Sequence, residues 1–183
     1  FCLIARTFAN LGITGMMPML KFILTVYGGL FIQLFIVYAI IFVLFTRLNP
    51  FWFLRKMLPV ILFAFSTSSS NATIPLNLET LERKCGVDEK VASFTIPLGA
   101  TINMSGTAIM QGVAVVFVAQ AFGIDLSTSA LMTVVITAVT AAIGTAGVPG
   151  VGTIMLAMVF ESVGLPAAGI AMIMGCLLYT SDA

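Results

Sequence analysis

The chain contains no histidine, and only 8% of its 183 residues are charged. The missing imidazole excludes Ser-His and Cys-His catalysis, and it also excludes histidine metal ligands and histidine proton relays. Cysteine is scarce as well, because Cys2, Cys85 and Cys176 lie far apart and form no recognisable disulfide or metal framework. The net charge of +1 gives no reason to expect a nucleic-acid partner. The apolar segments also hold no acid–base pair, so we expect the protein not to be an enzyme and to need no cofactor.

What the chain has in excess is apolar sequence. Hydrophobic residues make up 60% of it, and the mean hydropathy is +1.16. A soluble domain carries roughly 25% charged residues, about three times the fraction found here. Most of the chain is therefore predicted to lie in a lipid bilayer, as a multi-pass protein of the cell membrane.

The first long apolar run lies within residues 1–50. We expect residues 1–15 to be the end of one membrane helix and residues 19–46 to be a complete spanning helix. At 1.5 Å per residue, a helix of about 28 residues reaches roughly 42 Å, enough to cross a bilayer with some tilt. Pro18 directly precedes this run, where the start of a helix tolerates proline.

Two short polar or glycine-rich stretches interrupt the apolar sequence, TSSSNATIP at 67–75 and GTAGVPG at 144–150. Their backbone groups would go unpaired against lipid, so such stretches occur only inside protein or beside a watery cavity. The apolar arm before the first one covers about ten residues, or roughly 15 Å of helix, half a bilayer. Residues 51–122 are therefore predicted to hold a re-entrant hairpin and a broken transmembrane helix. Residues 123–175 are predicted to hold a second re-entrant hairpin and the start of a final helix.

Basic residues indicate the orientation of these segments. Six of the eight Lys and Arg residues flank the two ends of the first hairpin: Arg47, Arg55, Lys56, Arg83, Lys84 and Lys90. That side is predicted to be cytoplasmic, and the second hairpin then enters from the opposite face. The predicted fold is an all-α integral membrane protein, an inverted repeat of re-entrant helical hairpins and broken transmembrane helices.

The first polar stretch places hydroxyl and amide groups at membrane depth: Ser68, Ser69, Ser70, Asn71 and Thr73. Pro75 suits the first turn of a new helix, whose free N–H groups and partial positive charge would favour a carboxylate. The alternative is that the serines only bond to helix carbonyls or allow close helix packing.

The glycine-rich stretch and a third polar stretch, at 103–107, are suited to a cation. Glycines 144, 147 and 150 free the backbone, so carbonyls there could coordinate a cation or clamp a substrate, unless the segment is a plain tight turn. The sequence NMSGT at 103–107 interrupts a spanning segment with hard oxygen donors, which suit a small alkali cation. Gly99, Asn103 and Thr107 would share one helix face, and the alternative is a packing face of small residues.

With these motifs in hand, the chain resembles the dicarboxylate/amino acid:cation symporter family, which includes glutamate, aspartate and neutral amino acid transporters. The resemblance runs from about residue 27 to residue 175. It rests on the serine-rich stretch at 68–75, PLGATINMSGT at 97–107, and the glycine-rich stretch at 144–150 followed by IMLAM at 154–158.

The resemblance implies residue roles. The substrate site would be formed by Ser69, Ser70, Asn71, Thr107, Val148 and Gly152. The sodium ligands would lie among Gly99, Thr101, Asn103, Met104, Ser105, Ala142, Ile143 and Thr145. The resemblance further implies that the intact protein is a homotrimer and that the second hairpin serves as a gate.

Two positions and the tail depart from the family pattern. Ser105 stands where the family usually has Asp, which removes a formal charge from a cation site and implies coupling to fewer sodium ions or to another ion such as protons. Asn71 stands where the family has serine, which would alter the fit of the substrate. Residues 176–183 do not match the family's final helix, and we expect them to be a truncated or non-native tail.

The expected function is secondary active symport by alternating access, which couples uptake of a dicarboxylate or amino acid to a cation gradient, with sodium as the coupling ion. The alternative is an ion channel with re-entrant pore loops, because channel filters also use backbone carbonyls. A channel would show flux without substrate coupling and would not need a carboxylate-sized serine tip.

Overall fold

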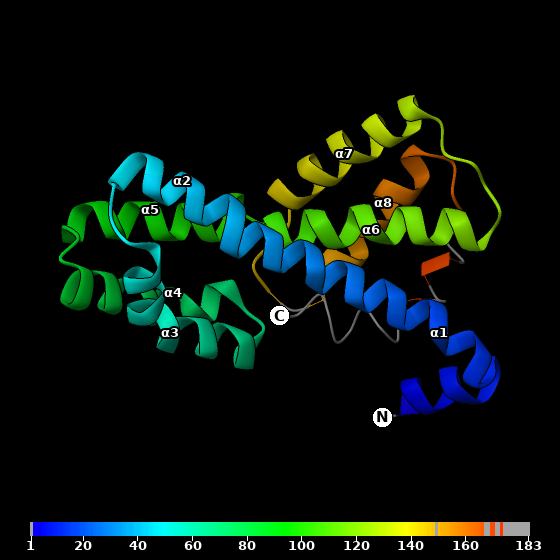
Figure 1. The fold of residues 1–183 in the computed structure, drawn as a ribbon, viewed down its shortest axis with the longest axis horizontal. Coiled ribbons are helices and arrows are strands. Elements are labelled where there is room, and N and C mark those ends of the chain that lie inside the picture. The colour runs from blue at the N-terminus through cyan, green and yellow to red at the C-terminus, as the bar shows by residue number, and fades with distance from the viewer. Residues whose placement is uncertain (1, 149, 167–168, 171–172, 174–183) are drawn as a thin grey trace.

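The computed structural model describes the backbone of residues 2–148, 150–166, 169, 170 and 173, and side chains from residue 17 onward within these ranges. Every regular element in this part of the chain is helical, which confirms the predicted all-α class (Figure 1). In chain order the elements are α1 (Cys2–Ile32), the π-helical turn η1 (Gln33–Val37), α2 (Tyr38–Thr46), α3 (Pro50–Thr67), α4 (Ser70–Thr80), the π-helical turn η2 (Leu81–Cys85), α5 (Glu89–Ile102), α6 (Ser105–Ala121), α7 (Thr128–Ile143) and α8 (Val151–Ser162). The predicted tail at 176–183 lies outside the described residues.

The first rod of the molecule consists of α1, η1 and α2, which follow one another without a loop. The predicted helix start at Pro18 is wrong, because α1 continues through this proline from Cys2. A proline within a helix removes one backbone hydrogen bond and bends the helix without necessarily ending it. Within the described residues, two helical stretches are long and apolar enough to cross a membrane, Met17–Thr46 and Glu89–Ala121.

Two helical hairpins flank the second rod, which consists of α5 and α6. The α3–α4 hairpin packs on α5, while α7 and α8 both pack on α6 (Figure 1). Each hairpin thus lies along its own half of the rod, and its tip is one of the two stretches singled out in the sequence. Entry of the hairpins into a bilayer from opposite faces stays a prediction.

Capping residues explain where the helices begin. Asn49 accepts a hydrogen bond from the Phe51 amide and is followed by proline at the first helical position of α3. Ser69 caps α4 in the same way, so the helix begins well before Pro75. The prediction that Pro75 occupies the first turn is therefore wrong. Pro75 lies inside α4, and because proline has no N–H, it cannot donate a helical hydrogen bond to the Asn71 carbonyl four residues earlier.

The break between α5 and α6 is narrower than expected. Only Asn103 and Met104 leave the helical conformation, whereas Ser105, Gly106 and Thr107 form the first turn of α6. The φ and ψ angles of Asn103 are −93° and 63°, outside the helical region. The amide N–H of Asn103 still bonds to the Gly99 carbonyl, which completes the last turn of α5.

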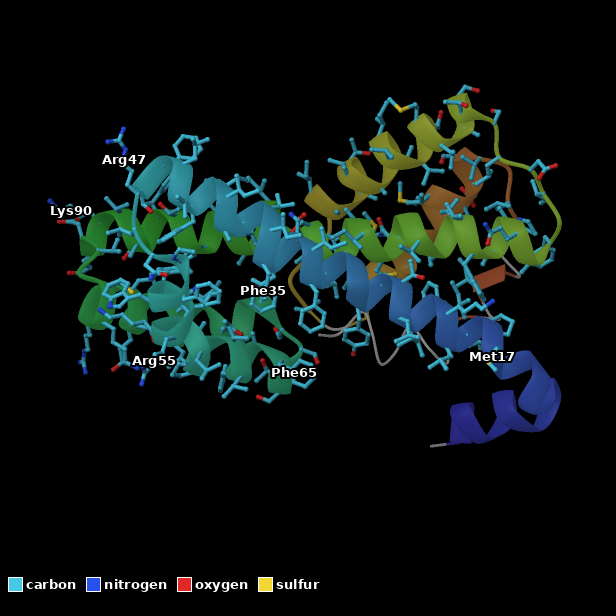
Figure 2. All side chains as sticks on the ribbon, viewed as in Figure 1. Met17, Phe35, Arg47, Arg55, Phe65 and Lys90 are labelled. Atoms are coloured by element: carbon cyan, nitrogen blue, oxygen red, sulfur yellow. The ribbon has the colours of Figure 1, made fainter. Side chains whose placement is uncertain are left out.

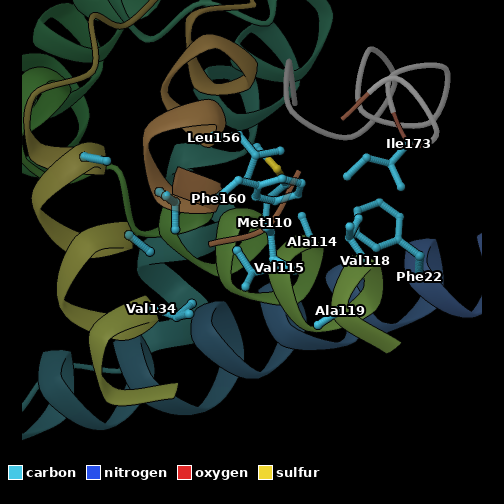
Figure 3. Close-up of a cluster of buried hydrophobic side chains, with 14 of the residues drawn as sticks. Phe22, Met110, Ala114, Val115, Val118, Ala119, Val134, Leu156, Phe160 and Ile173 are labelled. Atoms are coloured by element: carbon cyan, nitrogen blue, oxygen red, sulfur yellow. The ribbon is translucent and has the colours of Figure 1, made fainter. Parts of the chain in front are cut away.

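The hydrophobic core surrounds α6, where it packs between α1, α7 and α8 (Figure 3). Val115 and Val118 of α6 are fully buried, as are Leu156 and Phe160 of α8. These side chains hold α8 against α6, and so they position the second tip, from which α8 continues, relative to the break.

Apolar side chains also lie on the outside along the length of the molecule. Met17, Phe35 and Phe65 are 62%, 46% and 62% exposed (Figure 2). The basic residues Arg47 and Lys90 gather at the far end of the rods, beyond this apolar belt (Figure 2). An exposed apolar belt that ends in cationic groups is typical of a surface that faces lipid.

Candidate functional site

A cavity of about 230 Å³ lies where the two hairpin tips meet the break between α5 and α6. Its volume equals that of about eight liquid water molecules, and it is below the roughly 300–1,000 Å³ typical of sites for drug-sized ligands. It suits a small solute. It is lined by Leu30, Ala64, Ser68, Ser69, Ser70, Asn103, Met104, Gly106, Thr107, Met110, Thr145, Ala146, Gly147, Val148 and Gly152.

Helix ends dominate the electrostatics of this cavity. Residues at or next to the starts of α4, α6 and α8 line it, and so does Thr145, just past the end of α7. Helix starts present free N–H groups and partial positive charge, whereas helix ends present free carbonyls and partial negative charge. Among the described residues no acidic or basic side chain lines the cavity. Backbone dipoles and side-chain oxygens therefore provide its polarity.

The first tip is formed by three successive serines. Ser68 ends α3 in the left-handed conformation, with φ 50°, so that the chain can turn directly into α4. The Ser69 hydroxyl oxygen then caps α4 by accepting the Ala72 amide at 3.3 Å. Ser70 is exposed, and its hydroxyl has no hydrogen-bond partner within the described part of the chain. It is thus available to a solute.

The two tips are joined at one carbonyl. The Gly147 carbonyl accepts a hydrogen bond from the Ser69 hydroxyl at 3.0 Å and another from the backbone N–H of Asn71 at 3.2 Å. A Cβ atom at position 147 would lie 3.0 Å from Asn71 Oδ1 and 3.1 Å from Ser70 Cβ. Only glycine permits this approach without displacing the first tip.

The second tip returns into α8 through Gly150, whose φ of +82° favours glycine. Two residues further, a Cβ at Gly152 would lie 3.2 Å from the Thr107 methyl group, so α8 packs closely on α6. Val148 remains 45% exposed at the cavity. The Thr107 hydroxyl has no hydrogen-bond partner within the described ranges and faces the same space.

Five of the six predicted substrate residues line the cavity, and the sixth, Asn71, contacts the second tip instead. The predicted sodium ligands are brought together less completely. Asn103, Met104 and Thr145 line the cavity, whereas Gly99, Thr101, Ser105, Ala142 and Ile143 do not.

The hydroxyls of two predicted sodium ligands are engaged with carbonyls of the preceding helical turn. The Thr101 hydroxyl donates to the Leu98 carbonyl at 2.9 Å, and the Thr145 hydroxyl donates to the Ala141 carbonyl at 2.7 Å. Each hydroxyl keeps lone pairs that could face a cation. The described residues contain no cluster of His, Cys, Asp or Glu that could hold a metal ion.

The sequence-based reasoning missed two polar residues near the site. Tyr38 of α2 contacts the side chains of Asn103 and Ser105. Gln111 of α6 is fully buried and donates to the Gly152 carbonyl at 3.2 Å. Both are polar side chains within apolar runs, and this isolation was the signal that could have revealed them.

Comparisons with known proteins show the family of this chain. The model of the sodium:dicarboxylate symporter family matches residues 1–179. The chain is 41% identical to neutral amino acid transporter A of Bos taurus over 154 residues, which cover 84% of this chain and 29% of that protein. It is 42% identical to excitatory amino acid transporter 1 of Rattus norvegicus over 149 residues, which cover 81% of this chain and 27% of the relative. The chain thus spans less than a third of the length of these curated relatives. It belongs to the sodium:dicarboxylate symporter family.

Proposed function

We propose that the intact protein is a secondary active symporter of the cell membrane, which couples uptake of an amino acid or dicarboxylate to a cation gradient by alternating access. The observation that carries this proposal is the small cavity where the two hairpin tips meet the broken helix, which no charged side chain of the described residues lines. Such a site can bind a small anion and a cation together, because helix starts and helix ends both reach it.

The carboxylate of the solute would bind at the helix starts. Ser70 and Thr107 offer hydroxyls without partners in the described structure, beside the first turns of α4 and α6. Val148 and Gly152 would bound the solute from the second hairpin, and Asn71 would support the first tip. Excitatory and neutral amino acid transporters are among the relatives, which favours an amino acid over a dicarboxylate.

The cation would bind at the helix ends. The last carbonyls of α5 and α7, together with Asn103 Oδ1, offer hard neutral oxygens, which suit sodium. Seven of the eight predicted sodium residues lie at or next to these helix ends, and Ser105 begins α6 on the other side of the break. Protons remain the alternative coupling ion, although no histidine is present to carry them.

Gating would occur at the contact between the tips. A solute that enters between them must displace the bonds from Ser69 and Asn71 to the Gly147 carbonyl, and these re-form when it is enclosed. Two hydrogen bonds of this kind contribute about 1–3 kcal/mol together, little enough for reversible opening.

We also propose that the intact protein is a homotrimer.

Uptake by proteoliposomes tests the proposal. The intact protein is reconstituted, and accumulation of labelled L-aspartate, L-alanine and succinate is measured with an inward sodium gradient, with a proton gradient, and with neither. We expect at least one of these solutes to accumulate only when a cation gradient is present. Accumulation that survives collapse of both gradients would overturn symport, and ion flux that is independent of every solute would favour the channel.

A further inference from the structure

The phenol of Tyr38 bridges the break from a different helix. Tyr38 is the first residue of α2, and its Oη atom lies 2.5 Å from Ser105 Oγ and 3.2 Å from Asn103 Oδ1. Asn103 is one of the two residues that leave the helix between α5 and α6, and Ser105 is the first residue of α6. Tyr38 is thus bonded to both sides of the interruption.

The number of available protons determines the direction of these bonds. An amide oxygen only accepts, so the single phenolic proton must be donated to Asn103 Oδ1. The 2.5 Å contact then requires Ser105 to donate its own proton to Tyr38. The amide of Asn103 is therefore held with its oxygen toward the phenol, and Ser105 Oγ receives no proton from Tyr38, so its lone pairs stay available.

The backbone that carries Tyr38 is irregular at this point. The π-helical turn η1 ends at Val37, and the Tyr38 amide itself closes it by donating to the Gln33 carbonyl. A π turn spreads its residues over a wider circle than an α turn, so it changes the direction of the side chain that follows it, and such turns are frequent at functional sites. The irregularity directs the phenol toward α6.

We propose that Tyr38 is a positioning residue for the coupling cation, which orients Asn103 Oδ1 and Ser105 Oγ so that both oxygens can coordinate it. This proposal rests on the cation-coupled function proposed above. A carboxylate at position 105 would attract a cation by charge. The serine in this chain has only its lone pairs, so their orientation decides how well the oxygen can serve as a ligand.

Sodium-dependent thermal stabilisation of the intact protein tests the role of Tyr38. A ligand that binds only the folded state stabilises it by RT ln(1 + [L]/Kd), so a fit of the melting temperature against NaCl concentration gives the sodium concentration that half-saturates the site, without any solute. Choline chloride keeps the ionic strength constant. We expect Tyr38→Phe to raise the half-saturating sodium concentration roughly three- to tenfold, the fold-change for loss of a hydrogen bond. The melting temperature of each variant in choline chloride is the baseline for its own titration.

Tyr27→Phe is the matched control, because Tyr27 lies in α1, is half-buried, and makes no hydrogen bond through its phenol within the described part of the chain. We expect its sodium titration to equal that of the parent protein. A Tyr38→Phe titration equal to the parent's would overturn the positioning role while leaving the proposed function standing. A parent protein that sodium does not stabilise more than choline would overturn both.

A double-mutant cycle with Ser105→Ala separates positioning from general destabilisation. If Tyr38 acts through Ser105 and its neighbour, Tyr38→Phe has a smaller effect on the half-saturating sodium concentration when Ser105 is already alanine. Effects that multiply independently would show that Tyr38 acts elsewhere, and would overturn the proposal.

Discussion

The two hairpin tips meet at one point but are formed in different ways. The first tip consists of side chains, because Ser68 ends one helix, Ser69 caps the next and Ser70 presents a hydroxyl. The second tip consists of backbone, because α8 begins at Gly150 without a side-chain cap, and a glycine carbonyl receives both bonds from the first tip.

This difference indicates which tip would stay fixed and which would move. A capped helix start keeps its conformation without a partner, since the cap satisfies its free N–H groups locally. The second tip has no such cap, and its contact with the first tip depends on a carbonyl that only a close approach can satisfy. We therefore expect the first tip to be the fixed wall of the site and the second to be the part that moves.

The contact between the tips is the most sensitive point of this comparison. In Gly147→Ala the new Cβ meets Asn71 and Ser70 at 3.0 and 3.1 Å, so the carbonyl must retreat from both of its donors. We expect the affinity for the transported solute to fall about thirtyfold, equivalent to about 2 kcal/mol. Gly144→Ala is the control on the same tip, because its nearest contacts lie at 3.7 Å. Equal affinities of the two variants would show that the tips do not close around the solute.

The hydroxyl of Ser70 tests whether the first tip binds the solute directly. We expect Ser70→Ala to lower solute affinity about tenfold, because a hydrogen bond to a carboxylate is worth roughly 1.5–3 kcal/mol. The melting temperature without solute should not change. Ser66→Ala is the control, since the Ser66 hydroxyl already bonds to the Phe63 carbonyl at 2.9 Å. Binding within about twofold of the parent would assign Ser70 to packing.

Ser69, which caps α4 in the first tip, can be compared with Ser127, which caps α7 away from both tips. Ser69 and Ser127 each accept an amide at 3.3 Å at the start of a helix, but only Ser69 also donates to Gly147. We expect Ser69→Ala and Ser127→Ala each to lower the free energy of unfolding by about 1 kcal/mol. Only Ser69→Ala should also weaken solute binding. A Ser127→Ala variant that weakens binding equally would mean that the effect passes through stability.

The smallest expected effect comes from placing a glycine, the residue on which the second tip turns, at position 68 of the first tip. Ser68 has φ 50°, a conformation that costs an L-residue roughly 1–2 kcal/mol and glycine very little. We expect Ser68→Gly to raise the free energy of unfolding by about 0.5 kcal/mol, because the greater freedom of glycine in the unfolded chain offsets part of the gain. Denaturant unfolding measures it. A loss of stability would show that the Ser68 side chain makes a stabilising contact.

Sequence patterns located both hairpin tips and the break between α5 and α6, because polar stretches and glycines within apolar runs act locally. The errors at Pro18 and Pro75 share a cause, since neighbouring packing and an earlier cap can hold a proline inside a helix against its local preference. The predicted break at 103–107 was in the right place but too long, since only Asn103 and Met104 leave the helix.

The sequence by itself determined that the chain is helical and apolar, that it is interrupted at three places, and that these interruptions carry hydroxyls, amides and free backbone rather than charges. Each of these properties depends on residues within one or two helical turns. Only the tertiary structure decided that the three interruptions share one cavity, that Gly147 accepts from the first tip, and that Tyr38 bonds to both sides of the break. Those contacts join residues 65 to 78 positions apart, and such pairings depend on how whole helices pack, which no local pattern encodes.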